Sequence, residues 1–221
     1  MITYKDTAMQ PTYTHLLLLC LIILFLPGTT TYSQPAADLG QAGQTDLESF
    51  NAMRLQINRA GMMTLGAWAV GNFVVGGIGW SRNSGSSMYF HQGNVMWNTV
   101  NAALAGFGLY GAMSAIPSSF GWHETITEHY AMEKLLLFNA GLDIGYMAAG
   151  LYLMERSKNS SKYAERFKGY GQALILQGGF LFVFDMALFA VHNRHGKMLE
   201  GILPAINLSQ QGLQLGLTIQ L

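Results

Sequence analysis

The chain has 221 residues, of which 50% are hydrophobic and only 11% are charged, and its formal net charge is zero. Soluble domains carry roughly a quarter charged residues, so this composition suits lipid better than water. No stretch of Lys and Arg is dense enough to follow a phosphate backbone, which argues against a nucleic-acid partner. The 26 glycines indicate closely packed helices instead.

Residues 1–34 have the pattern of a secretory signal peptide. The apolar run Leu16 to Leu26 is too short to span a bilayer and ends at Pro27. Small polar residues follow, which predicts cleavage near Gln34. An uncleaved anchor is the alternative, because Lys5 is the only Lys or Arg before the run. Cys20, the single cysteine, lies in this segment, so a cleaved chain would have no disulfide and no thiolate ligand.

Residues 35–44 form a predicted linker, and residues 45–198 a predicted membrane domain. Four apolar runs, at about 62–80, 91–113, 135–154 and 170–192, are each near the 20 residues that a spanning helix needs. We therefore expect an all-α membrane protein, a bundle of four transmembrane helices. A shift of 74 residues aligns Gly71, Gly76 and Arg82 with Gly145, Gly150 and Arg156. Two repeated helical hairpins are thus one interpretation of the bundle, and a chance match is the other.

The orientation follows from two independent features. A cleaved signal peptide leaves the mature N-terminus outside, which places the loop from Glu155 to Lys168 in the cytoplasm. This loop is also the one richest in Lys and Arg, as the positive-inside rule requires. We expect a multi-pass protein of the plasma (inner) membrane with both termini outside.

The tail, residues 199–221, differs in pattern from the rest. Apolar and polar residues alternate from Leu213 to Leu221, the period of a half-buried strand. Ile206 and Leu208 would begin an opposing strand. The pattern predicts a short outward-facing β-hairpin, with a frayed tail as the alternative.

Polar groups interrupt every apolar run, although such groups are costly in lipid. Two are ionisable, Asp143 and Asp185, and the others are the amides Asn72, Asn94, Asn98, Asn101, Asn139 and Gln177. At a rise of about 1.5 Å per residue, Asp143, Asp185 and Asn72 lie roughly 10 to 15 Å below the predicted outer ends of their spans. We therefore expect a polar cluster in the outer half of the membrane. Gly141 and Gly145 bracket Asp143 in a GxxxG pattern, which predicts close approach of another helix there.

The polar cluster has two interpretations. It either holds the helices together through interhelical hydrogen bonds, with one or both aspartates neutral, or it binds a proton, a cation or another ligand.

Histidines form a second group of candidate site residues. His123, His129, His192 and His195 are all expected at the outer face, with Glu124, Glu128 and Glu133 nearby. Such residues are possible ligands for zinc, copper or iron, but the HExxH pattern fails because Thr127 replaces its second histidine. Solvated interfacial side chains are the simpler interpretation, so we assign no metal and no cofactor.

The runs Gly61 to Asn72, Asn94 to Ala105 and Asn139 to Gly150 resemble those of an uncharacterised family of bacterial four-helix membrane proteins with a signal peptide. The resemblance covers most of residues 45–195. It implies topology only, because no catalytic role is known for that family.

Three hypotheses for function remain. The favoured one is a non-enzymatic structural or accessory membrane protein, with the lipid bilayer and other membrane proteins, or further copies of itself, as partners. The second is a small ion- or proton-coupled transporter or channel subunit that uses Asp143 and Asp185. The third is a metal-dependent membrane enzyme that uses the outer histidines.

Overall fold

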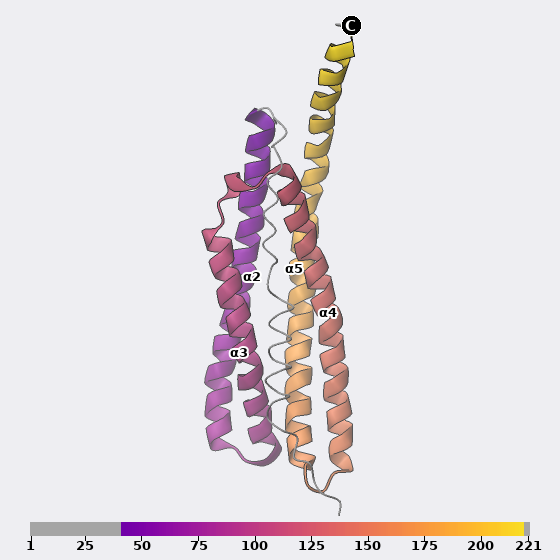
Figure 1. Cartoon of the computed structure of the whole chain (residues 1–221). Coiled ribbons are helices and arrows are strands. Elements are labelled where there is room, and N and C mark those ends of the chain that lie inside the picture. The colour runs from indigo at the N-terminus through magenta and orange to yellow at the C-terminus, as the bar shows by residue number, and fades with distance from the viewer. Residues whose placement is uncertain (1–40, 219–221) are drawn as a thin grey trace, which may run out of the picture. The chain divides into compact units, whose positions relative to one another are not determined.

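A computed structural model describes the backbone of residues 41–218 and the side chains of residues 43–199. Within these residues the chain is entirely helical, with four long helices and one 3-10 turn (Figure 1). The elements are α2 (Gln41–Arg82), α3 (Gly85–Ser114), η1 (Pro117–Ser119), α4 (Trp122–Lys158) and α5 (Ala164–Thr218). The all-α class is confirmed for the described residues, while the predicted signal peptide lies outside them.

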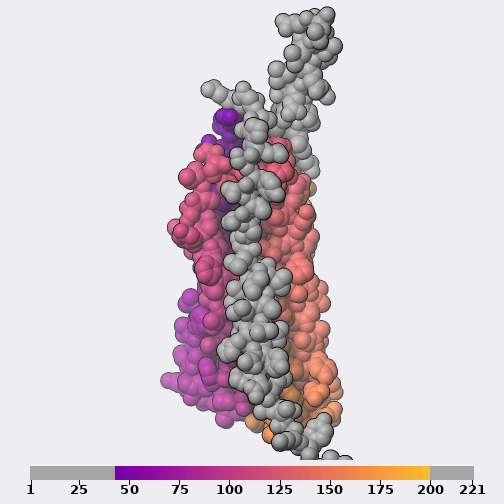
Figure 2. All heavy atoms as spheres, viewed as in Figure 1, coloured from indigo at the N-terminus to yellow at the C-terminus, as the bar shows by residue number. Residues whose placement is uncertain are grey.

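Sequential helices pair as two hairpins. The closest pairings are α4 with α5 and α2 with α3, and α5 also packs against α3 and α2. Figure 2 shows α2 and α3 on one side of the viewed face and α4 on the other. The turn between α2 and α3 requires Gly85, whose φ of +60° favours glycine. Helix α5 thus contacts every other long helix, which makes it the element on which polar groups from the others converge.

Apolar side chains cover much of the outer surface of the helices. Val75, Phe107, Leu151 and Val183 are each more than 55% exposed, whereas the interior contains many polar residues. Large exposed apolar surfaces are rare on soluble monomers and are expected where lipid surrounds the protein. This distribution is the reverse of a water-soluble fold.

Three of the described helices are long and apolar enough to cross a membrane. They are Gly43–Arg82, Trp122–Lys158 and Ala164–Leu199. The predicted span at 91–113 lies on α3, which is not among them. Its three asparagines, Asn94, Asn98 and Asn101, lower the mean hydropathy of its apolar run.

The predicted β-hairpin in the tail is wrong. Helix α5 continues through Thr218, so the predicted strand residues up to that point are helical, and residues 219–221 lie outside the described part. Alternation of Leu with Gln or Gly does not select a strand when no partner strand is available. Extending an existing helix also avoids the cost of a new nucleus. At the other end, α2 begins at Gln41, inside the predicted linker.

Helices α4 and α5 approach each other closely at Gly150 and Gly171, which are not the glycines of the GxxxG pattern. A Cβ atom on Gly150 would lie 2.6 Å from the carbonyl oxygen of Gly171, and the reverse distance is also 2.6 Å. Within the described residues nothing lies within 4 Å of a Cβ atom on Gly141 or Gly145, so the close helix approach predicted for them does not occur among α2 to α5. The closest contact between α4 and α5 therefore depends on Gly150 and Gly171.

Candidate functional site

Gln177 on α5 is the centre of a buried polar group that joins three helices. Its Oε1 accepts a hydrogen bond from the indole N–H of Trp68 on α2, at 2.9 Å. Its Nε2 donates to Asn94 Oδ1 on α3 at 2.6 Å and to Asn72 Oδ1 on α2 at 3.2 Å. Phe180, one turn further along α5, stacks on Trp68 with ring centroids 3.8 Å apart. All three of these hydrogen bonds from the Gln177 side-chain amide go to other helices.

The remaining amides lie on the same faces but bond more locally. On α3, Asn98 donates to the carbonyl of Asn94 at 2.8 Å, and Asn101 donates to Asn98 Oδ1 at 3.3 Å. All three of these asparagines are buried. On α4, Asn139 is half-buried, and its Oδ1 is a buried atom without a hydrogen-bond partner in the described residues. The three asparagines therefore present a polar stripe of α3 to the bundle interior.

Asp143 on α4 and Asp185 on α5 face each other. Both are almost fully buried, and their carboxyl groups lie close enough to interact directly. Asp143 Oδ2 has no hydrogen-bond partner within the described residues. The two acids therefore form a buried carboxyl pair between α4 and α5.

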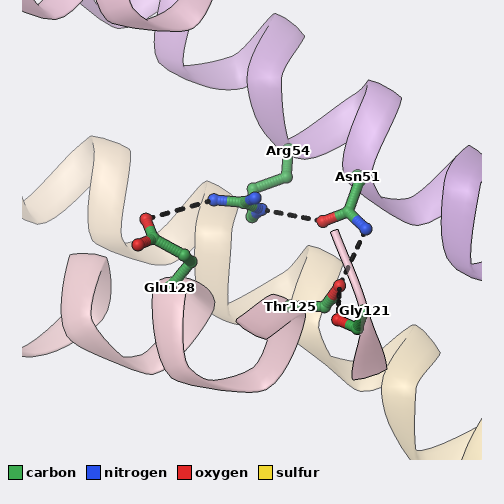
Figure 3. Close-up of polar contacts among 5 residues, drawn as sticks. All are labelled: Asn51, Arg54, Gly121, Thr125 and Glu128. Carbon is green, nitrogen blue, oxygen red and sulfur yellow. Dashed lines mark hydrogen bonds and ion pairs between the residues drawn. The ribbon is translucent and has the colours of Figure 1, made fainter. Parts of the chain in front are cut away.

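A second polar group lies where the first half of α2 meets α4 (Figure 3). Asn51 donates to Thr125 Oγ1 at 2.8 Å and accepts from Arg54 Nε at 3.2 Å, and Thr125 in turn donates to the carbonyl of Gly121 at 2.9 Å. Arg54 Nη1 lies 3.8 Å from Glu128 Oε2. The Arg54 side chain is almost fully buried, while Glu128 is exposed. The guanidinium also lies over the ring of Phe120, 4.7 Å from its centroid.

Beside this group, three of the four predicted histidines come together. His129 on α4 and His192 on α5 are fully buried, and His195 is 7% exposed. The ring centroid of His129 lies 6.0 Å from that of His192 and 6.3 Å from that of His195. His123 is exposed and is not part of the cluster. The structure therefore buries residues that the sequence pattern placed in solvent.

Asn51 and Arg54 were not recognised as interior residues from the sequence. They lie three residues apart in a polar stretch of α2 that gives no hydropathy signal. Leu47, Phe50 and Leu55 are buried on the same part of the helix. The i, i+3 and i+8 spacing of those apolar residues was the available signal for a buried face. Asn51 and Arg54 belong to that face because they lie four residues after Leu47 and Phe50.

Comparison with known proteins gives one family and no described function. No curated protein and no solved structure is similar to the chain. The family of unknown function DUF6992 matches residues 64–186. This range contains Gln177, its partners and both aspartates, and it ends before His192. Because the match covers more than half of the 221 residues, the chain belongs to the family of unknown function DUF6992.

Proposed function

We propose that this chain is an integral membrane protein with a structural or accessory role, in which all four long helices cross the bilayer and a polar interior fixes how they pack. The observation that carries the proposal is Gln177, whose amide bonds to side chains from α2 and α3 at once. Between spanning helices, lipid supplies no competing hydrogen bonds, so such contacts favour one helix register over others.

The burial pattern of α3 supports its assignment as a fourth span. Asn94, Asn98 and Asn101 are at most 3% exposed, whereas Phe107 and Tyr110 on the same helix are more than 70% exposed. The mean hydropathy of the α3 sequence counts these asparagines as if their side chains faced lipid. In the bundle they face α5 and one another, so the surface that α3 would present to lipid is mostly apolar.

The orientation in this proposal follows from the basic loop. The segment between α4 and α5 contains Lys162, with Arg156, Lys158, Arg166 and Lys168 in the adjoining helix turns. The positive-inside rule puts such a loop in the cytoplasm. With four spans, the N-terminal end of α2 and the C-terminal half of α5 then lie outside.

A second candidate function is supported by one specific observation, the carboxyl pair of Asp143 and Asp185. A buried pair of acids between two helices resembles the proton-binding sites of membrane transporters in its chemistry. Four spans enclose little space, so a transport role would also require a homo-oligomer.

Substitutions of Asp143 separate the two candidate functions. Asn keeps a hydrogen-bond donor for Asp185 but cannot carry a transferable proton, whereas Leu keeps neither. For a structural role, we expect Asp143→Asn to melt within a few degrees of the wild-type protein in detergent, and Asp143→Leu to melt well below it because Asp185 loses its partner. The same three proteins are then reconstituted in vesicles containing a pH-sensitive dye. The structural proposal predicts no wild-type proton flux above that of empty vesicles. Proton flux in the wild type that disappears in folded Asp143→Asn would establish the second candidate instead.

A further inference from the structure

Three histidines and one glutamate meet where the first half of α2 packs against α4 and α5. His129 and Glu133 come from α4, and His192 and His195 come from α5. All four residues are less than 10% exposed. His129 lies about 21 Å along α4 from Asp143. The cluster is therefore separate from the polar residues around Gln177.

The ring nitrogens of this cluster are the first observation that points to a ligand. Both nitrogens of His129 and both of His192 are buried, and none of them makes a hydrogen bond within the described residues. Buried polar atoms are nearly always paired because an unpaired one loses its hydration without compensation. A neutral imidazole always offers one nitrogen lone pair. Two such imidazoles side by side form a natural binding site for a metal ion.

The position of Glu133 beside His129 is the second observation. A Cβ atom on Gly196 would overlap His129 Nε2, so glycine at this position lets the imidazole pack directly against α5. On another side, Glu133 Oε1 lies 3.3 Å from the same nitrogen without making an aligned hydrogen bond. Two ligands of one tetrahedral zinc ion, with bonds of about 2.0 to 2.1 Å, are also roughly 3.3 Å apart.

His195 is oriented as metal-binding histidines usually are. Its Nε2 lies 3.0 Å from the carbonyl oxygen of Phe50, and its ring stacks on Phe50 with centroids 4.1 Å apart. Donation from Nε2 to that carbonyl leaves the lone pair on Nδ1. Metal ligands commonly have their second ring nitrogen fixed by a backbone carbonyl in this way.

We propose that His129, Glu133, His192 and His195 bind one divalent first-row transition-metal ion, with Zn²⁺ as the simplest probe. Imidazole nitrogens with a carboxylate oxygen are a ligand set that such ions favour. The carboxylate of Glu133 also disfavours an anion in this place. Arg54, 3.8 Å from the exposed Glu128, is a nearby cation that opposes a bound metal ion, so the negative charge of Glu133 is needed in the ligand set.

Binding requires a small inward movement of the rings. Imidazole centroids around a tetrahedral ion are about 5 Å apart, compared with 6.0 and 6.3 Å between the rings here. For this reason no three ligating side chains in the described residues already surround a common point. Binding would require the rings to approach one another by about 1 Å through side-chain rotation.

The test uses the full chain, purified in detergent without chelator, and its His192→Leu, Glu133→Gln and His123→Leu variants. His123→Leu is the matched control, because His123 is on α4 but exposed and outside the cluster. Each protein is titrated with Zn²⁺ while the melting temperature is followed, and with Co²⁺ while the visible absorption of tetrahedral cobalt is followed.

We expect one ion per chain in the wild type and in His123→Leu, with a rise in melting temperature as Zn²⁺ is added. In His192→Leu and Glu133→Gln the affinity should fall at least tenfold. Glu133→Gln keeps the shape of the side chain, so it remains informative if His192→Leu fails to fold. The proposal is overturned if the folded wild type binds no ion, or if the affinity is unchanged in Glu133→Gln. It is equally overturned if His123→Leu weakens binding as much as the cluster variants do.

Discussion

The Gln177→Leu variant is expected to melt well below the wild-type protein in detergent. Leucine fills a similar volume but leaves three groups on other helices without their partner, including the indole N–H of Trp68 and Oδ1 of Asn94. Each buried group left unpaired costs about 1 to 3 kcal/mol, and interhelical hydrogen bonds in membranes are worth on average about 0.6 kcal/mol. With three groups affected, we therefore expect a total loss of at least about 2 kcal/mol, which is the sum at about 0.6 kcal/mol for each hydrogen bond.

The control for this variant is Gln56→Leu, which makes the same chemical change at an exposed position of α2. Its melting temperature should stay near that of the wild type. The two variants are compared by tryptophan fluorescence and circular dichroism during heating. Equal melting temperatures for Gln177→Leu and Gln56→Leu would mean that the hydrogen bonds of Gln177 do not hold the helices together.

Gly150→Ala and Gly145→Ala should change stability in opposite directions. The new methyl group at Gly150 would lie 2.6 Å from the carbonyl oxygen of Gly171, a backbone atom that cannot rotate away. Helices α4 and α5 must then separate, and overpacking of this kind costs about 1 to 3 kcal/mol. At Gly145 the same methyl group meets nothing within 4 Å, so the higher helix propensity of Ala, worth about 1 kcal/mol, dominates.

Both alanine variants are best measured as the urea or detergent concentration at which half of the helical signal is lost. Gly150→Ala should unfold earlier than the wild type, and Gly145→Ala at the same concentration or later. A destabilised Gly145→Ala beside an unchanged Gly150→Ala would indicate that the GxxxG pair, and not the Gly150–Gly171 crossing, is the packing contact.

The sequence predicted the helices and the polar positions better than it predicted contacts. Helix existence follows from long apolar runs, whose periodicity is a strong local signal. Counting residues from the ends of two runs placed Asp143 and Asp185 at similar depth, and the two carboxyl groups are in contact. The partners of Gln177 could not be predicted in this way, because depth does not show which way a helix is rotated.

The misjudged elements share a physical cause, which is dependence on tertiary packing. His129 and His195 were expected in solvent because of their place at the predicted outer face, yet α2 extends far enough for Phe50 to pack against both rings. Gly141 and Gly145 match a packing motif, but they lie on a part of α4 that faces away from α5. The tail alternates like a strand and continues as a helix, because its pattern alone supplies no strand partner.

The central claim, that α2 to α5 all cross the membrane, is tested most directly by single cysteines in the connecting segments. In a Cys20→Ser background the chain has no other cysteine, so Ser84→Cys, Ser118→Cys and Ser161→Cys each carry one reactive thiol at an exposed position. The cells are treated with a membrane-impermeant maleimide before and after permeabilisation. We expect Ser118→Cys to be labelled in intact cells, and the other two only after permeabilisation. Labelling of Ser84→Cys and Ser118→Cys from the same side would show that α3 does not cross, and would contradict the four-span account.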